Sequence, residues 1–196
     1  MMKFFRLSTL GDLNDPELVM LDGPPEGMEL RSYCMSEGDS SSRFYPEDAK
    51  VFMDADQPGI KLSSLLGNTS RYLIVHASMK EVIAAQCQDL EVEYLPFDLF
   101  DHRKRLYSRD YFIINPIGTR DCLDPVASGV KIGSQGGVIH VARYVLDPKK
   151  VVGLPVLFRP NEERSIYLVS EPLAGALMEK AFTNVRLEPL AISDRA

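Results

Sequence analysis

The sequence predicts an α+β fold with a mainly antiparallel or mixed β-sheet, two or more packed helices and a loop-rich N-terminal third. The 196 residues are enough to bury a hydrophobic core, as one large domain or two small ones. Hydrophobic residues make up 45% and charged residues 26% of the chain, close to the usage of soluble globular proteins. Several short apolar or alternating segments of strand length accompany two segments with helical signals, and this mixture defines the class.

Residues 1–7 are predicted to form the first strand. They mix basic and apolar side chains, and no long apolar core or small-residue cleavage site follows, so they do not resemble a secretory signal. No apolar run in the sequence approaches the roughly 20 residues needed to cross a bilayer. A membrane-spanning role is therefore not expected, and a cytoplasmic location is.

Turn-forming residues dominate the N-terminal third. Residues 11–42 are rich in Asp, Gly, Pro and Ser, with Gly-Pro-Pro-Glu-Gly at 23–27, and a further break follows at 54–59. We therefore expect residues 1–70 to form a loop-rich N-terminal subdomain or layer and residues 71–196 to form a compact α+β domain.

The first elements of the compact part are a strand and a helix. Residues 72–75 form an aliphatic strand candidate. Ser78 then precedes Glu81 by three residues, which is the spacing of a capping box, and predicts a helix to about Cys87. The apolar residues of this helix lie on a roughly helical stripe, which indicates core packing.

Residues 91–94 alternate charged and bulky side chains with period two. This pattern predicts a half-buried strand whose Glu91 and Glu93 face solvent. Residues 97–100 remain β-like, and a charged loop at 101–105 closes the segment. The basic run in that loop is too short and isolated to indicate nucleic-acid binding.

The remaining elements are further strands and one more helix. Residues 111–114 are all apolar or aromatic, as expected for a strand covered on both faces. Turn residues at 159–164 predict a hairpin between two later strands. Ser170 is placed to cap a second helix through about Phe182, with Glu171 near its positive end. Other strand candidates are residues 138–145, 155–158, 165–169 and 184–190.

Acidic residues outnumber basic ones, 28 to 22, and give a net charge of −6. This balance argues against nucleic acid as a partner, whereas it suits either a basic protein partner or simple solubility. The three cysteines are widely separated and form no Cys-x-x-Cys pair, so they indicate neither a disulfide framework nor a zinc site. They fit a reducing compartment.

A dense group of polar residues follows the aromatic strand candidate and is where an active site would be sought. It contains Asn115, Asp124 and Ser128 around Cys122. Cys122 with His140 and Asp124 is the best set for a cysteine-dependent hydrolase or transferase, because a thiolate needs a neighbouring base or cation. A buried core cysteine is the competing interpretation, since free cysteine is among the most buried residue types.

Metal and cofactor sites are not expected. The three histidines, His76, His102 and His140, have no ligand spacing on one helical face. The glycine-rich segment 133–137 leads into a strand pattern instead of a helix and lacks the Lys-Ser or Lys-Thr of a phosphate-binding loop. It therefore predicts a hairpin turn.

Short motifs follow one another between residues 72 and 190: Leu73-Ile74-Val75, residues 91–96, residues 111–115, Cys122-Leu123-Asp124 with Ser128, Leu157-Phe158-Arg159 and residues 168–171. Their succession resembles immunity protein family eleven of bacterial polymorphic toxin systems, formerly a domain of unknown function. The resemblance does not extend to the N-terminal third.

The resemblance implies a small α+β protein that binds and neutralises a cognate antibacterial toxin in the producing cell. It brings no catalytic residue, metal or cofactor. Asn115, Cys122, Asp124 and Ser128 match the signature positions, and their polar groups would satisfy backbone groups at turns and strand ends.

Six acidic residues are candidate contacts for such a toxin. We expect them to be exposed and to face a basic partner through electrostatic complementarity, and ordinary surface charge is the alternative. They are Asp54, Asp56, Glu91, Glu93, Asp98 and Asp101. Three hypotheses therefore remain: a toxin-neutralising protein, an enzyme that uses Cys122 and His140, and a scaffold or homo-oligomerisation module.

Overall fold

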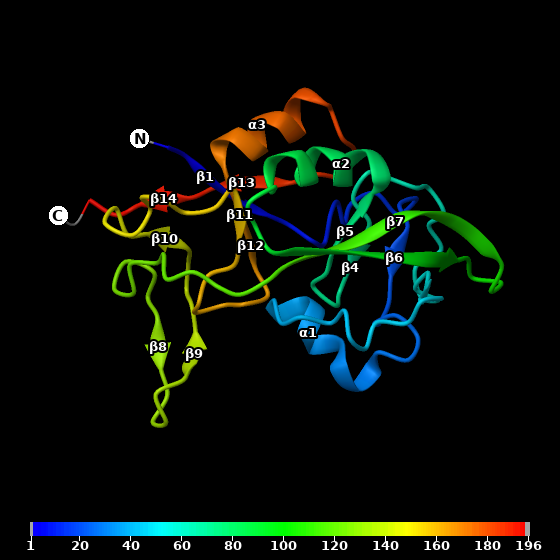
Figure 1. Cartoon of the computed structure of the whole chain (residues 1–196), viewed down its shortest axis with the longest axis horizontal. Coiled ribbons are helices and arrows are strands. Elements are labelled where there is room, and N and C mark those ends of the chain that lie inside the picture. The colour runs from blue at the N-terminus through cyan, green and yellow to red at the C-terminus, as the bar shows by residue number, and fades with distance from the viewer. Residues whose placement is uncertain (1, 195–196) are drawn as a thin grey trace.

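A computed structural model describes residues 2–194 and has the predicted α+β class, with 15% helix and 31% strand. One four-stranded mixed sheet has the order β3 (Lys50–Phe52), β6 (Val92–Phe100), β7 (Leu106–Pro116), β5 (Leu73–His76). Strands β3 and β6 are parallel, whereas β7 is antiparallel to both β6 and β5. The long strands β6 and β7 extend to one end of the molecule (Figure 1).

A second four-stranded sheet is antiparallel in every pair. Its order is β11 (Leu157–Phe158), β12 (Tyr167–Ser170), β1 (Phe4–Leu7), β13 (Leu187–Pro189). The pairing of β11 with β12 confirms the hairpin predicted around residues 159–164. Strand β1, from the start of the chain, therefore lies between two strands from its end.

Three two-stranded sheets complete the β-structure. Strands β2 (Met20–Leu21) and β4 (Gly67–Asn68) are parallel, as are β10 (Val145–Leu146) and β14 (Ala191–Ile192). Strands β8 (Lys131–Ile132) and β9 (Val138–His140) form an antiparallel hairpin that projects from the body (Figure 1). The single strand predicted over 138–145 is therefore two strands that belong to different sheets.

Helices α2 (Ala77–Gln86) and α3 (Glu171–Glu179) lie side by side on one side of the sheets, and α1 (Ser32–Glu37), with the 3-10 turn η1 (Glu29–Arg31), lies on the other side (Figure 1). Helix α2 buries Met79 and Ile83, and α3 buries Leu173, Ala174 and Leu177, in one common hydrophobic cluster.

The predicted helix starts require correction. The N-cap of α2 is His76, whose Nδ1 accepts from the backbone N–H of Ser78 at 3.2 Å, so Ser78 lies inside the helix and the capping box is wrong. Ser170 is the N-cap of α3 as predicted, but its side chain makes no capping hydrogen bond. Helix α3 ends at Glu179, before the predicted Phe182, and Ala181 follows it with a positive φ of 50°.

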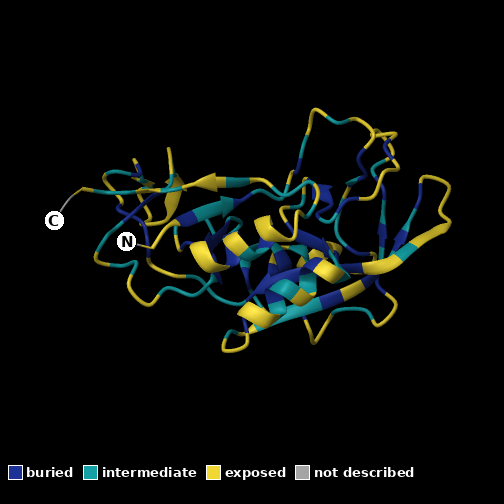
Figure 2. Ribbon diagram, turned by 90° about the horizontal axis from the view of Figure 1, so that it is seen from above, coloured by how far each residue is buried: buried dark blue, intermediate teal, exposed yellow. Residues whose placement is uncertain are grey.

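The N-terminal third contributes directly to the hydrophobic core. Val19, Leu21 and Met35 pack in one cluster with Ile74 and Ile113 of the mixed sheet. Figure 2 shows buried residues gathered in the centre, with exposed loops around them. The predicted division at residue 70 remains a prediction, and the core crosses that position.

Candidate functional site

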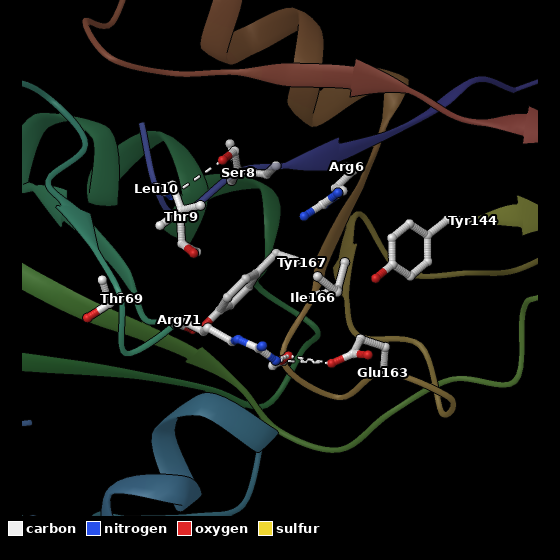
Figure 3. A pocket seen from close by; sticks show the side chains of 12 residues that line it. Arg6, Ser8, Thr9, Leu10, Thr69, Arg71, Tyr144, Glu163, Ile166 and Tyr167 are labelled. Carbon is white, nitrogen blue, oxygen red and sulfur yellow. Dashed lines mark hydrogen bonds and ion pairs between the residues drawn. The ribbon is translucent and has the colours of Figure 1, made fainter. Parts of the chain in front are cut away.

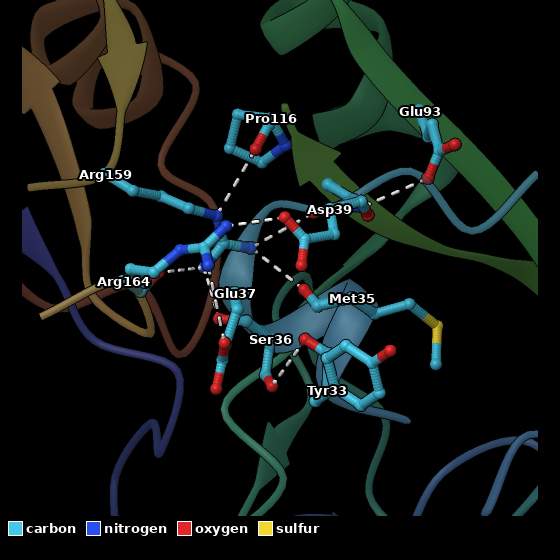
Figure 4. Close-up of polar contacts among 10 residues, drawn as sticks. Tyr33, Met35, Ser36, Glu37, Asp39, Glu93, Pro116, Arg159 and Arg164 are labelled. Carbon is cyan, nitrogen blue, oxygen red and sulfur yellow. Dashed lines mark hydrogen bonds and ion pairs between the residues drawn. The ribbon is translucent and has the colours of Figure 1, made fainter. Parts of the chain in front are cut away.

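A fully buried arginine lies where the N-terminal third meets the two large sheets. Arg159 follows β11, and none of its side chain is exposed. The guanidinium donates to the carbonyls of Met35 (2.9 Å), Ser36 (2.7 Å) and Arg164 (2.7 Å), and Nε donates to that of Pro116 (3.3 Å) (Figure 4). Because Met35 and Ser36 belong to the last turn of α1, Arg159 satisfies helix carbonyls that have no partner within the helix.

The chain bends tightly around this arginine. Gly38 ends α1 in the left-handed conformation, with φ of 77°. A Cβ at this position would lie 2.9 Å from Arg159 Cδ and 2.9 Å from the Pro116 carbonyl, so the close approach requires glycine. Arg164 also holds this segment through ion pairs with Glu37 and Asp39 (Figure 4).

Asn115 extends the network to a neighbouring carboxylate. Its Oδ1 accepts from Arg159, and its Nδ2 donates to the carbonyl of Asp39 (2.9 Å) and to Glu93 Oε2 (3.0 Å). Asn115 and Glu93 are cross-strand neighbours in the β6–β7 pair. Asn115 therefore joins the sheet to the segment that follows α1.

Glu93 is a structural anchor, which corrects its prediction as a free, solvent-facing carboxylate. It accepts hydrogen bonds from the backbone N–H groups of Ser41 and Ser42 and from the hydroxyls of Ser40 and Ser41, at 2.7–3.1 Å. Partial burial acts to raise its pKa, but the hydrogen bonds, that of Ser40 first, outweigh burial and lower the pKa below the usual value.

Asp124 and Ser128 fix the loop before the β8–β9 hairpin. Asp124 Oδ1 accepts from the backbone N–H groups of Val126 (3.0 Å) and Ala127 (2.9 Å), which closes a turn. The buried Ser128 hydroxyl donates to the Val145 carbonyl (3.0 Å) and accepts from the Val145 N–H (3.1 Å). These contacts join the chain before the hairpin to the chain after it.

Cys122 and His140 are not assembled into a catalytic pair. Cys122 is fully buried in a cluster with Phe4, Leu146 and Phe158, whereas His140 is exposed on the projecting hairpin. Within residues 2–194, no hydrogen bond joins the two side chains. Burial, with smaller contributions from the carboxylates of Glu162 and Asp121, raises the pKa of the Cys122 thiol to about 12.

We expect no fast-reacting thiol in the native protein, because Cys34, Cys87 and Cys122 are all buried. Treatment with a chromogenic disulfide reagent at pH 8 should label the native chain slowly, and denaturant should release all three thiols at once. A Cys122→Ala variant identifies the contribution of that residue. Rapid labelling of native Cys122 would contradict the buried assignment.

The remaining acidic candidates occupy different environments. Asp101 is 7% exposed, so the expectation that it faces solvent is wrong. Arg105 lowers the pKa of Asp101, first through a backbone hydrogen bond and then through its side chain. Asp98 lies 3.2 Å from Arg109 in an ion pair. Asp54 accepts from the backbone N–H of Asp56, while Asp56 and Glu91 are exposed. A role of these residues in partner binding remains a prediction.

A pocket of about 320 Å³ lies between β1, the β4–β5 turn and the segment before β10 (Figure 3). Arg6 and Arg71 reach it from opposite sides, and Tyr144 closes a third side. Arg71 donates to Glu163 at 3.2 Å, and Arg6 lies 3.5 Å from Glu188. Because each guanidinium already has a carboxylate partner, part of the positive charge at the pocket is offset within the protein.

No local pattern in the sequence predicts this pocket, because its lining comes from four separate segments of the chain. Arg71 adopts a positive φ of 61°, which is unusual for a residue with a side chain. No histidine or cysteine lines the pocket, so it offers hydrogen-bond donors and lacks a thiol or imidazole for nucleophilic chemistry.

Two further findings bear on function. Among residues 2–194, no group of three or more His, Cys, Asp or Glu side chains is placed to hold a metal ion. In the same part of the chain, no helix has both the length and the apolar character needed to span a bilayer.

Asn115, Asp124 and Ser128 thus join segments of the backbone through hydrogen bonds, and Cys122 packs in the core of a small α+β protein. The model of the Immunity protein family (Imm11) matches residues 12–191, and the chain belongs to this family. The match also covers most of the N-terminal third, which the sequence motifs did not reach. No curated protein matches the chain.

Proposed function

We propose that this chain is an immunity protein that binds a cognate antibacterial toxin and neutralises it by occupying its surface. Membership of the immunity protein family carries the proposal. The site geometry supports it, because Asn115, Asp124 and Ser128 make structural hydrogen bonds and Cys122 is enclosed in apolar side chains. The proposed location is the cytoplasm of the producing cell.

The alternative, a cysteine-dependent hydrolase or transferase, is less well supported. It requires a thiolate within reach of a base. Burial of Cys122 and exposure of His140 oppose that arrangement, and the high pKa of the thiol opposes ionisation near neutral pH. An oligomerisation module has no observation in its favour beyond the exposed apolar residues treated below.

Co-expression tests the proposal. The toxin domain encoded in the adjacent reading frame is induced in a susceptible bacterium, with and without this chain on a second plasmid. We expect the chain to restore growth, and the Cys122→Ala variant to restore it equally. A toxin that remains lethal when the chain accumulates as soluble protein would contradict the pairing, and loss of protection by Cys122→Ala with the folded protein retained would favour the enzyme.

A further inference from the structure

The β8–β9 hairpin is an exposed element that carries three large apolar side chains. Ile132 is 65% exposed, Ile139 70% and Val138 40%. Within the part of the chain that the structure describes, β8 and β9 pair only with each other. A single exposed isoleucine is ordinary, but this hairpin exposes three β-branched side chains and pairs with no other sheet in the described residues, so its apolar surface is available to a partner.

The base of this hairpin is rigid although its strands are exposed. Backbone N–H groups of Ala142 and Arg143 donate to the carbonyl of Ser128, and Arg143 Nε donates to that of Ala127. Ser128 is itself fixed to Val145 by two hydrogen bonds. Buried polar residues of the family signature thus hold an exposed apolar element in one position, which is the arrangement of a preorganised binding site.

The tip and strands of the hairpin favour contact through side chains. The turn at residues 133–137 is Gly-Ser-Gln-Gly-Gly, which lets another surface approach closely. Ile132 and Val138 are cross-strand partners, and a register shift separates this pair from the pair Lys131–His140. A bulge and an edge lysine both oppose the addition of a further strand. A partner would therefore contact the apolar side chains of the hairpin and would not pair with its backbone.

The charge around the hairpin differs from that of the whole chain. Residues 125–146 include Lys131 and Arg143 and no acidic residue, in a chain of net charge −6. Lys131 and His140 have no ion pair or side-chain hydrogen bond within residues 2–194. The complementary surface would be apolar with an acidic border, and so opposite in charge to the basic partner that the net charge suggests.

We infer that the β8–β9 hairpin is the principal toxin-binding element, and that Ile132 and Ile139 insert into an apolar depression on the toxin whose border is acidic. The inference rests on the proposed function and adds to it the contact surface and the chemistry of the partner. Glu93 and Asp101, whose carboxylates each accept several internal hydrogen bonds, do not form this contact.

The test measures affinity between the purified full-length chain and the toxin domain encoded in the adjacent reading frame. Burial of two isoleucines predicts that Ile132→Ser/Ile139→Ser weakens binding by at least roughly 30-fold. The matched control is Ile60→Ser/Met178→Ser, which removes two exposed apolar side chains elsewhere on the molecule and should leave the dissociation constant unchanged. Both double variants should keep the wild-type melting temperature, because none of the four side chains is buried.

Charge is tested separately. We expect Lys131→Glu to slow association several-fold at low salt, and the exposed Lys104→Glu, on the loop between β6 and β7, to have no effect. If the wild-type chain binds and the hairpin double variant binds within threefold of it, the hairpin inference is overturned and the proposed function stands. If the wild-type chain does not bind, the proposed function fails and the inference falls with it.

A second copy of this chain is the alternative to the toxin as the molecule that covers the hairpin. Light scattering on the wild-type chain should give a monomer. A dimer that the Ile132→Ser/Ile139→Ser variant disrupts, with toxin binding unchanged, would assign the hairpin to contact between copies and overturn the inference.

Discussion

Replacing Arg159 with alanine should lower the free energy of unfolding by about 4 kcal/mol. The guanidinium is fully buried and donates to carbonyls of Met35, Ser36, Pro116 and Arg164. Alanine leaves these acceptors without donors and opens a cavity where the side chain lay. The effect reaches α1, the end of β7 and the β11–β12 hairpin together, because Arg159 joins all three.

Urea unfolding followed by far-UV circular dichroism measures this loss. The matched control is Arg103→Ala, since Arg103 is exposed and its side chain forms no hydrogen bond in the described part of the chain; its change should stay within about 0.5 kcal/mol. Should Arg159→Ala fail to accumulate as folded protein, Arg159→Lys provides the measurement, because lysine keeps the charge but not the planar set of donors. A loss below about 1 kcal/mol for Arg159→Ala would contradict the assigned role.

The second large effect is expected at Glu93. Its carboxylate accepts hydrogen bonds from Ser40, Ser41, Ser42 and Asn115. Glu93→Gln should lower the free energy of unfolding by about 2 kcal/mol at pH 7, because an amide has one acceptor oxygen where the carboxylate has two. Partial solvent exposure of Glu93 limits this loss. The control is Glu91→Gln, two residues earlier and exposed, whose effect should be negligible.

The contribution of Glu93 should also depend on pH. Its pKa in the folded chain lies below 4.5, the ordinary value for a glutamate, so the unfolded chain binds the proton more readily. The stabilisation is therefore fully present above about pH 4.5 and is lost as the pH falls through the folded pKa. The difference in unfolding free energy between wild type and Glu93→Gln should shrink below pH 4.5. A difference that stays constant down to pH 3 would contradict this carboxylate as the source.

Local patterns in the sequence predicted much of the fold. The aliphatic run before α2, the aromatic run in β7 and the turn residues between β11 and β12 all correspond to elements in the structure. Helix boundaries were less predictable, because His76 supplies the cap that the Ser78 pattern suggested. The parallel pairing of β3 with β6 joins segments far apart in sequence. Hydrophobic periodicity predicts individual strands but does not indicate which strands pair.

In the candidate site too, contacts between segments far apart in sequence could not be predicted from local patterns. Strand alternation placed Glu93 toward solvent, but the segment that follows α1 folds back onto it and supplies hydroxyl and N–H donors. Asp101 was expected at the surface of a charged loop, and Arg105 of that same loop encloses it. Burial of Arg159 against α1 could not be predicted, because the residues next to it along the chain carry no pattern that indicates it.

Titration of the active toxin domain with purified chain tests the central claim, neutralisation by binding, most directly. Residual toxin activity should fall linearly with added chain and reach zero near one chain per toxin, and the mass of the toxin should be unchanged after incubation. Complete inactivation by a small fraction of an equivalent, or a change in the toxin's mass, would contradict a binding mechanism.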